Sequence, residues 1–170
     1  MDFSSILTVL GAAALPISEV RGAIPLAILK FDFPWYYALL FALIGNMLPV
    51  PFILLLLNRA SNFLSKIIIF DRMFKWLFER TRRKGTIIER YERIGLMLFV
   101  AVPFPLTGAW TGAIAAVLVG IEFKHALLSI LAGVFIAGII VTVLTLLGWI
   151  GALIAGIGLA VIVALGFWKS

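Results

Sequence analysis

Glu19 and Arg21 are the only ionisable side chains in an otherwise apolar stretch that runs from residue 6 to residue 29. A charged side chain near the centre of a bilayer costs roughly 2.5 to 3.5 kcal/mol on insertion scales, and such a cost indicates a use. Glu19 could serve as a proton or cation site, and Arg21 as its partner or as a ligand for an anionic headgroup. The structural alternative is that Arg21 extends to the interface from a shallow hairpin while Glu19 caps a helix.

Two helix-breaking residues flank this pair, with Pro16 before it and Gly22 after it. Residues two positions apart lie on different faces of a regular helix, so Glu19 and Arg21 can cooperate only where the chain is unwound. Proline removes a backbone donor and glycine frees the backbone, and together they favour such an unwound stretch. We therefore place Pro16 and Gly22 in the candidate substrate or proton site with the two charges.

A second broken stretch contains the rest of the candidate binding site. Its candidate residues are Pro103, Pro105, Thr107, Gly108, Trp110 and Gly112. The Thr107 hydroxyl can bond backbone groups freed by the prolines, and the two glycines allow helices to approach closely. The Gly-x-x-x-Gly spacing is equally compatible with helix packing alone.

Asn46 is a further candidate, because it lies inside a long apolar segment shortly before Pro49 and Pro51. A buried amide needs hydrogen-bond partners. Asn46 could contact either broken stretch, or it could form a structural hydrogen bond between helices.

Enzymatic chemistry has little support in this sequence. The chain has no cysteine and one histidine, His125, so it cannot supply a zinc triad or a buried Ser-His pair. No Walker A or Gly-x-Ser-x-Gly sequence occurs, and its three aspartates lie outside the apolar spans. We expect no enzyme activity, no metal and no cofactor, and any transport should be secondary or passive.

The composition predicts an integral membrane protein. Of its 170 residues, 64% are hydrophobic, which is too apolar for a water-soluble domain. Ten of the fourteen Lys and Arg residues fall between residues 59 and 93, and cytoplasmic loops collect such residues. We interpret the net charge of +6 as a topology signal and not as a nucleic-acid site. Residues 59 to 93 are expected to be cytoplasmic, in a multi-pass protein of a prokaryotic plasma membrane.

Three uninterrupted apolar stretches reach the length of about 20 residues that a membrane-spanning helix needs. They cover residues 35–57, 126–147 and 149–168. Two other regions, 5–30 and 94–119, are broken at their middle by the stretches described above. Unwound backbone in lipid is tolerated only where protein or a water-filled cavity satisfies it, so we expect two re-entrant helix hairpins. The alternative is two kinked spans.

The polar segment 59–93 shows an amphipathic helical pattern, with Phe63, Ile67, Phe70 and Phe74 at helical spacing and basic residues opposite. It should lie in the cytoplasmic interface plane. A break at Lys84-Gly85-Thr86 should precede a short second helix over residues 87–93.

The two halves of the chain resemble each other. Gly22-Ala23-Ile24 precedes Asp32-Phe33 at the same spacing at which Gly112-Ala113-Ile114 precedes Glu122-Phe123. Gly45 in the first half corresponds to Gly133 in the second half. With residues 59–93 inside the cell, the two units have opposite orientations. The predicted organisation is a first repeat over 1–58, a linker over 59–93, a second repeat over 94–148 and a final transmembrane helix over 149–170.

The stretches from Pro16 to Pro25 and from Pro103 to Gly112 resemble the two signature stretches of the putative small multidrug export protein family. That family is remotely similar to the DedA (SNARE-associated, VTT-domain) superfamily. The resemblance covers nearly the whole chain and implies two re-entrant hairpins, an inverted repeat, and lipid-phosphate or proton-coupled transport. The second hairpin departs from the DedA pattern because it carries no arginine.

The sequence therefore favours a secondary, proton-coupled transporter that moves a lipid phosphate carrier or a small amphipathic molecule. A small cationic multidrug exporter is one alternative, and a passive lipid scramblase or a membrane scaffold is another. The expected partners are membrane lipids and the transported molecule, with no nucleic acid. Because so short a chain encloses a pathway with difficulty, we also expect a homodimer formed through small residues such as Ala152 and Gly156.

Overall fold

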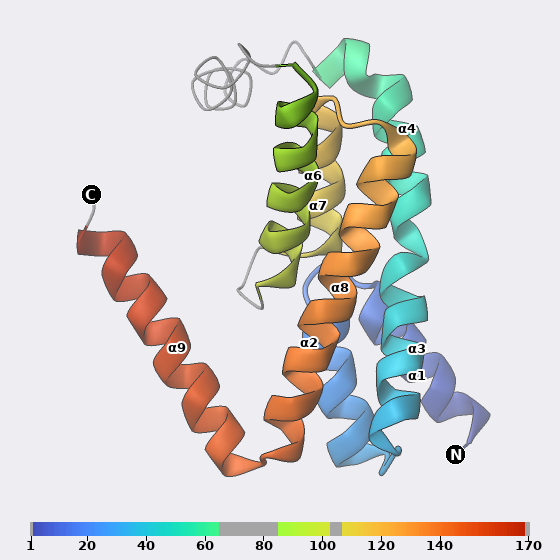
Figure 1. Ribbon diagram of the computed structural model, residues 1–170. Coiled ribbons are helices and arrows are strands. Elements are labelled where there is room, and N and C mark those ends of the chain that lie inside the picture. Colours follow the sequence, from blue (N-terminus) through green and yellow to red (C-terminus); the bar gives the residue numbers. More distant parts are fainter. Residues whose placement is uncertain (1, 65–84, 103–106, 169–170) are drawn as a thin grey trace.

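The computed structural model describes residues 2–64, 85–102 and 107–168, and the described chain folds into helices without a β-strand (Figure 1). The first half contains α1 (Phe3–Ala14), α2 (Glu19–Pro25), the π-helical turn η1 (Leu26–Lys30), α3 (Trp35–Met47) and α4 (Pro49–Leu64). The second half contains α6 (Gly85–Ala101), α7 (Ala109–Val119), α8 (Phe123–Leu146) and α9 (Trp149–Trp168). The prediction of an all-helical protein is confirmed for these residues.

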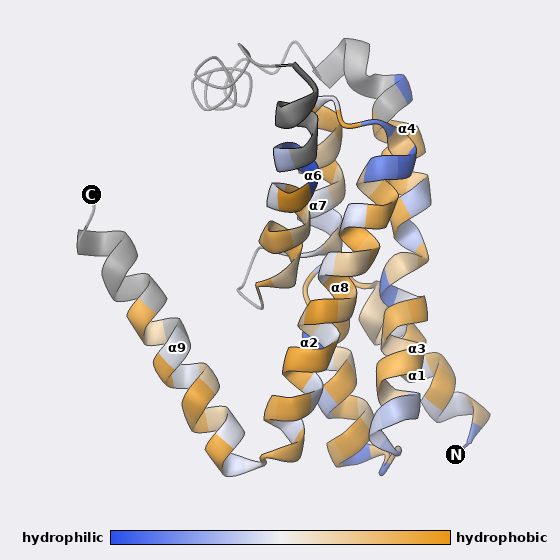
Figure 2. Ribbon diagram, in the orientation of Figure 1, coloured by the Kyte–Doolittle hydropathy of each residue, from blue (hydrophilic) through white to orange (hydrophobic). Residues whose placement is uncertain are grey.

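Among the described residues, two helical segments are long and apolar enough to cross a membrane, namely Trp35–Leu57, formed by α3 and the start of α4, and Phe123–Leu146 of α8. They match two of the three predicted spans. Figure 2 shows that these helices are mostly hydrophobic, whereas hydrophilic residues gather near the two ends of the bundle. Apolar surface facing outward along such helices fits a protein whose solvent is lipid. Helix α9 covers the third predicted span, for which membrane crossing stays a prediction.

The two broken regions each fold into two helices, of which α6, with 17 residues, is the longest. Helix α1 has 12 residues and α7 has 11, so each is less than about 20 Å long at about 1.5 Å per residue. In Figure 1 the pair α1 and α2 lies in the lower half of the bundle, and the pair α6 and α7 lies in the upper half. The end of α1, the start of α2 and the start of α7 all lie near mid-height.

Proline and backbone strain explain the first break. Leu15 is extended, with φ −75° and ψ 140°, because the residue before a proline avoids the helical region. Glu19 adopts a positive φ of 48°, which is uncommon for a residue with a side chain and reorients the chain as α2 begins. At the other end of α2, Pro25 cannot donate a helical hydrogen bond, and the wider π-helical turn η1 follows it.

The helices pack in a crossed arrangement. Within each half of the chain, the first hairpin helix packs on the following long helix, α1 on α3 and α6 on α8. Between the halves, α2 packs on α8 and α7 packs on α4. Small residues at the contacts, including Ala13, Ala23, Ala113 and Ala126, have no exposed surface, as expected where membrane helices approach closely.

Glycines make the closest of these approaches in both halves. A Cβ added at Gly45 of α3 would lie 2.5 Å from the Leu10 carbonyl oxygen of α1. One added at Gly133 of α8 would lie 2.7 Å from the Met97 carbonyl oxygen of α6. The two glycines of the sequence repeat therefore perform the same packing role.

Three further expectations concern the remaining segments. Residues 65–84, which include most of the predicted amphipathic helix, lie outside the described residues, as do Pro103 and Pro105. Helix α6 runs without interruption from Gly85 to Ala101, so the short helix expected over 87–93 is the first part of a longer one. A glycine at position 85 is tolerated there because it stands at the helix start. Helix α9 packs against α8 and leans away from the other helices (Figure 1).

The arrangement leads to a topology prediction. Helix α4 ends and α6 begins at the end of the bundle opposite to the connection from α2 to α3, which includes η1 and its last residue Lys30 (Figure 1). Reporter tags between residues 80 and 84 are expected to be cytoplasmic, and tags after Lys30 should face outward. Accessibility of both tags from one side would mean that Trp35–Leu57 does not span the membrane.

Candidate functional site

Glu19 and Arg21 form an ion pair at the start of α2. The Arg21 Nη2 atom lies 3.8 Å from Glu19 Oε2, and the two side chains are 21% and 7% exposed. The positive φ of Glu19 takes the chain out of regular helical geometry at this point. Two residues that a continuous helix would hold apart therefore point to the same place.

The Glu19 carboxylate also lies against the start of α7. The Trp110 backbone N–H donates to Glu19 Oε1 at 3.4 Å, which is a long hydrogen bond. Gly108 immediately precedes α7, and a Cβ added there would overlap the Glu19 carboxylate. The position must therefore lack a side chain for the carboxylate to reach the positive end of the α7 dipole.

Two more hydrogen bonds join the hairpin tips. The Trp110 indole Nε1–H donates to the Ala14 carbonyl oxygen at the end of α1, at 3.0 Å. Arg21 Nη2 donates to the Thr107 hydroxyl at 3.4 Å. We refer to Glu19, Arg21, Thr107, Gly108 and Trp110 as the inter-hairpin cluster. It brings together charged and polar groups from positions about 90 residues apart in the sequence.

Local hydrogen bonds hold the second tip in position. The Thr107 hydroxyl donates to the Val102 carbonyl oxygen near the end of α6, at 2.8 Å. The Thr111 hydroxyl accepts the Gly108 backbone N–H at 2.9 Å, so it caps the start of α7. Thr107 thus bonds a backbone carbonyl at the end of α6, next to Pro103 in the sequence.

Other predicted residues lie outside this cluster. Gly22 packs against Ser18 within the first tip, and Gly112 packs against Val100 of α6, which is a helix-packing role. Pro16 is exposed at the tip. Sequence reasoning missed the Ala14 carbonyl, although the proline two residues later indicates a helix end with carbonyls that need donors.

Asn46 is fully buried in the last turn of α3. Neither its side-chain nitrogen nor its side-chain oxygen has a hydrogen-bond partner among the described residues. Sequence analysis expected such a partner on a neighbouring helix or hairpin. The described structure provides a buried amide with its hydrogen-bonding capacity unused.

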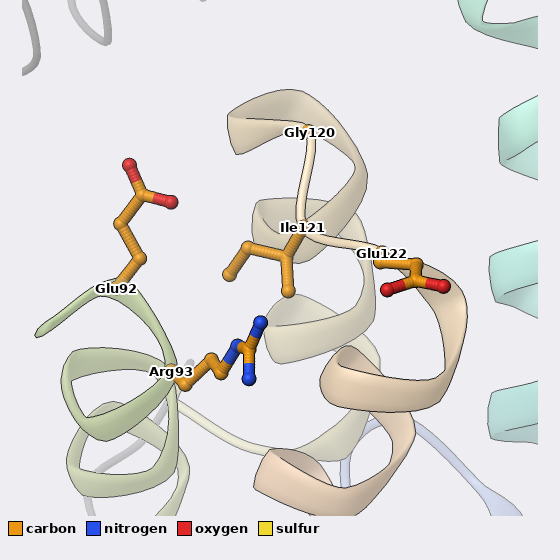
Figure 3. Close-up of a pocket in the computed structure, with 5 residues that line it drawn as sticks. All are labelled: Glu92, Arg93, Gly120, Ile121 and Glu122. Atoms are coloured by element: carbon orange, nitrogen blue, oxygen red, sulfur yellow. The ribbon is translucent and has the colours of Figure 1, made fainter. Parts of the chain in front are cut away.

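A separate cavity of about 130 Å³ lies near one end of the bundle, between α6 and the connection from α7 to α8. Glu92, Arg93, Gly120, Ile121 and Glu122 line it, and Figure 3 shows Arg93 extending from α6 toward Ile121 and Glu122. This cavity lies away from the inter-hairpin cluster and contains none of the predicted site residues.

Comparison with known proteins identifies the family. A family described as "Putative small multi-drug export protein" matches residues 19–140, which is well over half of the chain and runs from the start of α2 into α8. The chain belongs to this family. No curated protein and no solved structure matches it.

Membership in the putative small multi-drug export protein family agrees with the apolar helices in indicating a membrane protein. The matched region begins at Glu19 and ends within α8, so every residue of the inter-hairpin cluster falls inside it. The cluster contains the Glu19 carboxylate, which can bind a proton, and the Arg21 guanidinium, which is a permanent positive charge. It also contains backbone N–H donors at the start of α7. The described residues include no group of three or more His, Cys, Asp or Glu able to hold a metal ion.

Proposed function

We propose that this protein is a secondary transporter that exports small amphipathic molecules across the membrane, driven by proton movement through Glu19. The observation that carries the proposal is the inter-hairpin cluster, where Glu19 bonds the Trp110 N–H and Arg21 bonds Thr107. Charged groups within membrane segments mark substrate and proton pathways. The family description, a putative small multi-drug export protein, supports the same class of function.

The proposed architecture is an inverted repeat of two re-entrant hairpins, each followed by a transmembrane helix. Support comes from the matching roles of Gly45 and Gly133, and from the crossed packing of α2 on α8 and α7 on α4. The short helices of both hairpins begin or end near mid-height in Figure 1. Broken helices that meet at the midplane of an inverted repeat form the substrate site in many secondary transporters.

The proposed mechanism uses the contacts of the cluster as the element that changes between states. Protonation of Glu19 removes its charge and weakens its hold on Arg21 and on the start of α7. The two tips can then separate, and the site opens to one side of the membrane at a time. The transported molecule binds between the tips and the proton leaves Glu19 toward the other side. No residue has a catalytic role in this cycle.

A lipid phosphate carrier is a second candidate substrate, and one observation favours it. The Arg21 guanidinium and the backbone N–H groups at the start of α7 converge on the Glu19 carboxylate, and donors of this kind bind phosphate as well. Under this alternative the anion replaces the Glu19 carboxylate among those donors. The passive alternatives, a scramblase or a membrane scaffold, need no coupling group at all.

Flux into reconstituted vesicles tests the proposal. Transport of a fluorescent organic cation that accelerates at least about tenfold under an imposed pH gradient is expected for the parent protein and not for Glu19→Gln. Flux of a labelled lipid phosphate under the same gradient would favour the second candidate. Flux of either probe at a rate that does not depend on the gradient would indicate a scramblase. Absence of flux for both probes would favour a membrane scaffold.

The proposal includes a cellular setting. The protein is placed in a prokaryotic plasma membrane with residues 59–93 in the cytoplasm, in accordance with the positive-inside rule. Helix α9, which leans away from the other helices, presents Ala152 and Gly156 for a homodimer.

A further inference from the structure

A stripe of buried residues runs along one face of α3 and α4 at helical spacing. It consists of Ala38, Ala42, Asn46, Val50 and Leu54, none of which is more than 1% exposed. The α3 part of this long helical segment packs on α2, whereas its α4 part packs on α7. Asn46 is therefore the single polar member of the stripe and lies where contact with one hairpin gives way to contact with the other.

The backbone beside Asn46 lacks two of the hydrogen bonds of a regular helix. In a regular helix the carbonyls of Gly45 and Met47 would accept hydrogen bonds from the backbone nitrogens at positions 49 and 51. Both of those positions are proline, which has no N–H to donate. The buried amide and the two carbonyls thus fall in one turn of the chain, at the junction of α3 and α4.

An unpartnered buried amide destabilises a protein, so its presence requires another reason. The polar groups at this junction suit a ligand that both donates and accepts a hydrogen bond. A hydroxyl group does both, and so does water. Asn46 lies on the long helical segment that both hairpins contact, through α2 on α3 and α7 on α4, so a separation of the tips under the proposed mechanism would change the contacts of this segment.

We propose that Asn46 is a specificity-determining residue that binds an uncharged hydroxyl-like group of the transported molecule, with water in its place when no substrate is bound. The inference rests on the proposed export function and adds the chemical class of group that the site selects. Glu19 and Arg21 respond to charge, whereas Asn46 responds to a neutral hydrogen-bonding group.

Thermal stability in detergent is the first measurement, because Leu is close to Asn in size and has no polar atoms. The Asn46→Leu variant is expected to unfold at or above the parent temperature, because the amide bonds no other described group of the protein that its removal would leave without a partner. A fall of more than about 3 °C would mean that the amide has a structural partner, and it would overturn the inference. The Thr142→Val variant is the control, because Thr142 is buried but its hydroxyl bonds the Gly138 carbonyl of its own helix.

Selectivity between two matched probes is the second measurement. Tetraphenylphosphonium has no hydrogen-bonding group, and its 4-hydroxyphenyl analogue differs from it by one hydroxyl. The parent and Thr142→Val should export the hydroxylated cation about tenfold more efficiently than the plain one. In Asn46→Leu the ratio of the two export rates should fall to about one, whatever the absolute rate of either probe.

The outcomes separate the inference from the proposed function. Equal preference for the hydroxylated probe in the parent and in Asn46→Leu would overturn the role of Asn46 while leaving export intact. Failure of the parent to move either cation would contradict export of this class, and the role of Asn46 with it.

Discussion

Replacing Glu19 and Arg21 together by glutamine is expected to restore the stability that either single replacement removes, while transport stays lost. Each single change strands one charge in a mostly buried position, since the Glu19 side chain is 7% exposed. Breaking a buried pair in this way destabilises proteins by about 3 to 5 kcal/mol, and the partial exposure of Arg21 places the expected loss at the lower end. The double variant leaves two neutral amides at the tip, which avoids the stranded charge.

Two quantities measured on the same preparations test this expectation, namely the unfolding temperature in detergent and the gradient-driven flux. Both single variants should unfold several degrees below the parent, and the double variant should recover most of that difference. Lys30→Gln is the control, because Lys30 is exposed at the end of the bundle. Single variants as stable as the parent would show that the two side chains do not form a buried pair. If the double variant transports at the parental rate, Glu19 and Arg21 have a structural role and no role in transport.

Gly108→Ala is expected to abolish transport almost as completely as loss of the Glu19 carboxylate. The added Cβ would overlap that carboxylate, so Glu19 must leave the start of α7 and lose the Trp110 N–H. Crowding of this kind typically lowers the free energy of unfolding by about 1 to 3 kcal/mol. We expect gradient-driven flux to fall at least about tenfold. Flux assays and thermal unfolding measure the two effects.

Two comparisons make the Gly108 result specific. Gly95→Ala in α6 is the matched control, because a Cβ there meets nothing within 4 Å and alanine favours a helix. In a Glu19→Ala background the carboxylate is absent, so Gly108→Ala should cost little further stability. If the two changes simply add, Gly108 and Glu19 do not interact.

The sequence predicted the elements of this fold well because each depends on local signals. Continuous apolar runs predict the spans Trp35–Leu57 and Phe123–Leu146, and Pro16 predicts that α1 ends just before it. The spacing of two between Glu19 and Arg21 suits an ion pair only outside a regular helix and predicts an unwound stretch from Pro16 to Gly22. The structure limits the break to residues 15–18, because α2 begins at Glu19 and contains Arg21 and Gly22, and the departure from helical geometry within α2 is the positive φ of Glu19.

Other parts of the site depend on contacts between distant segments, which one sequence does not encode locally. The Gly-x-x-x-Gly spacing leaves helix packing and a site role equally open for Gly108, and nothing near Gly108 in the sequence indicates that its neighbour is the Glu19 carboxylate. The bond from the Trp110 indole to Ala14 joins residues 96 positions apart, and nothing at either position indicates the other. The positive φ of Glu19 likewise follows from the hairpin geometry, since glutamate has no preference for that conformation.

Sided labelling of the two hairpin tips tests the central claim, a polar site between tips that enter from opposite faces. The chain has no cysteine, so Ser18→Cys and Thr107→Cys each introduce one unique thiol. A small membrane-impermeant thiol reagent is applied to either face of reconstituted vesicles. We expect the thiol at position 18 and the thiol at position 107 to react from opposite faces. Reaction of both thiols from the same face only would contradict the account, because it would mean kinked spans or a static cavity.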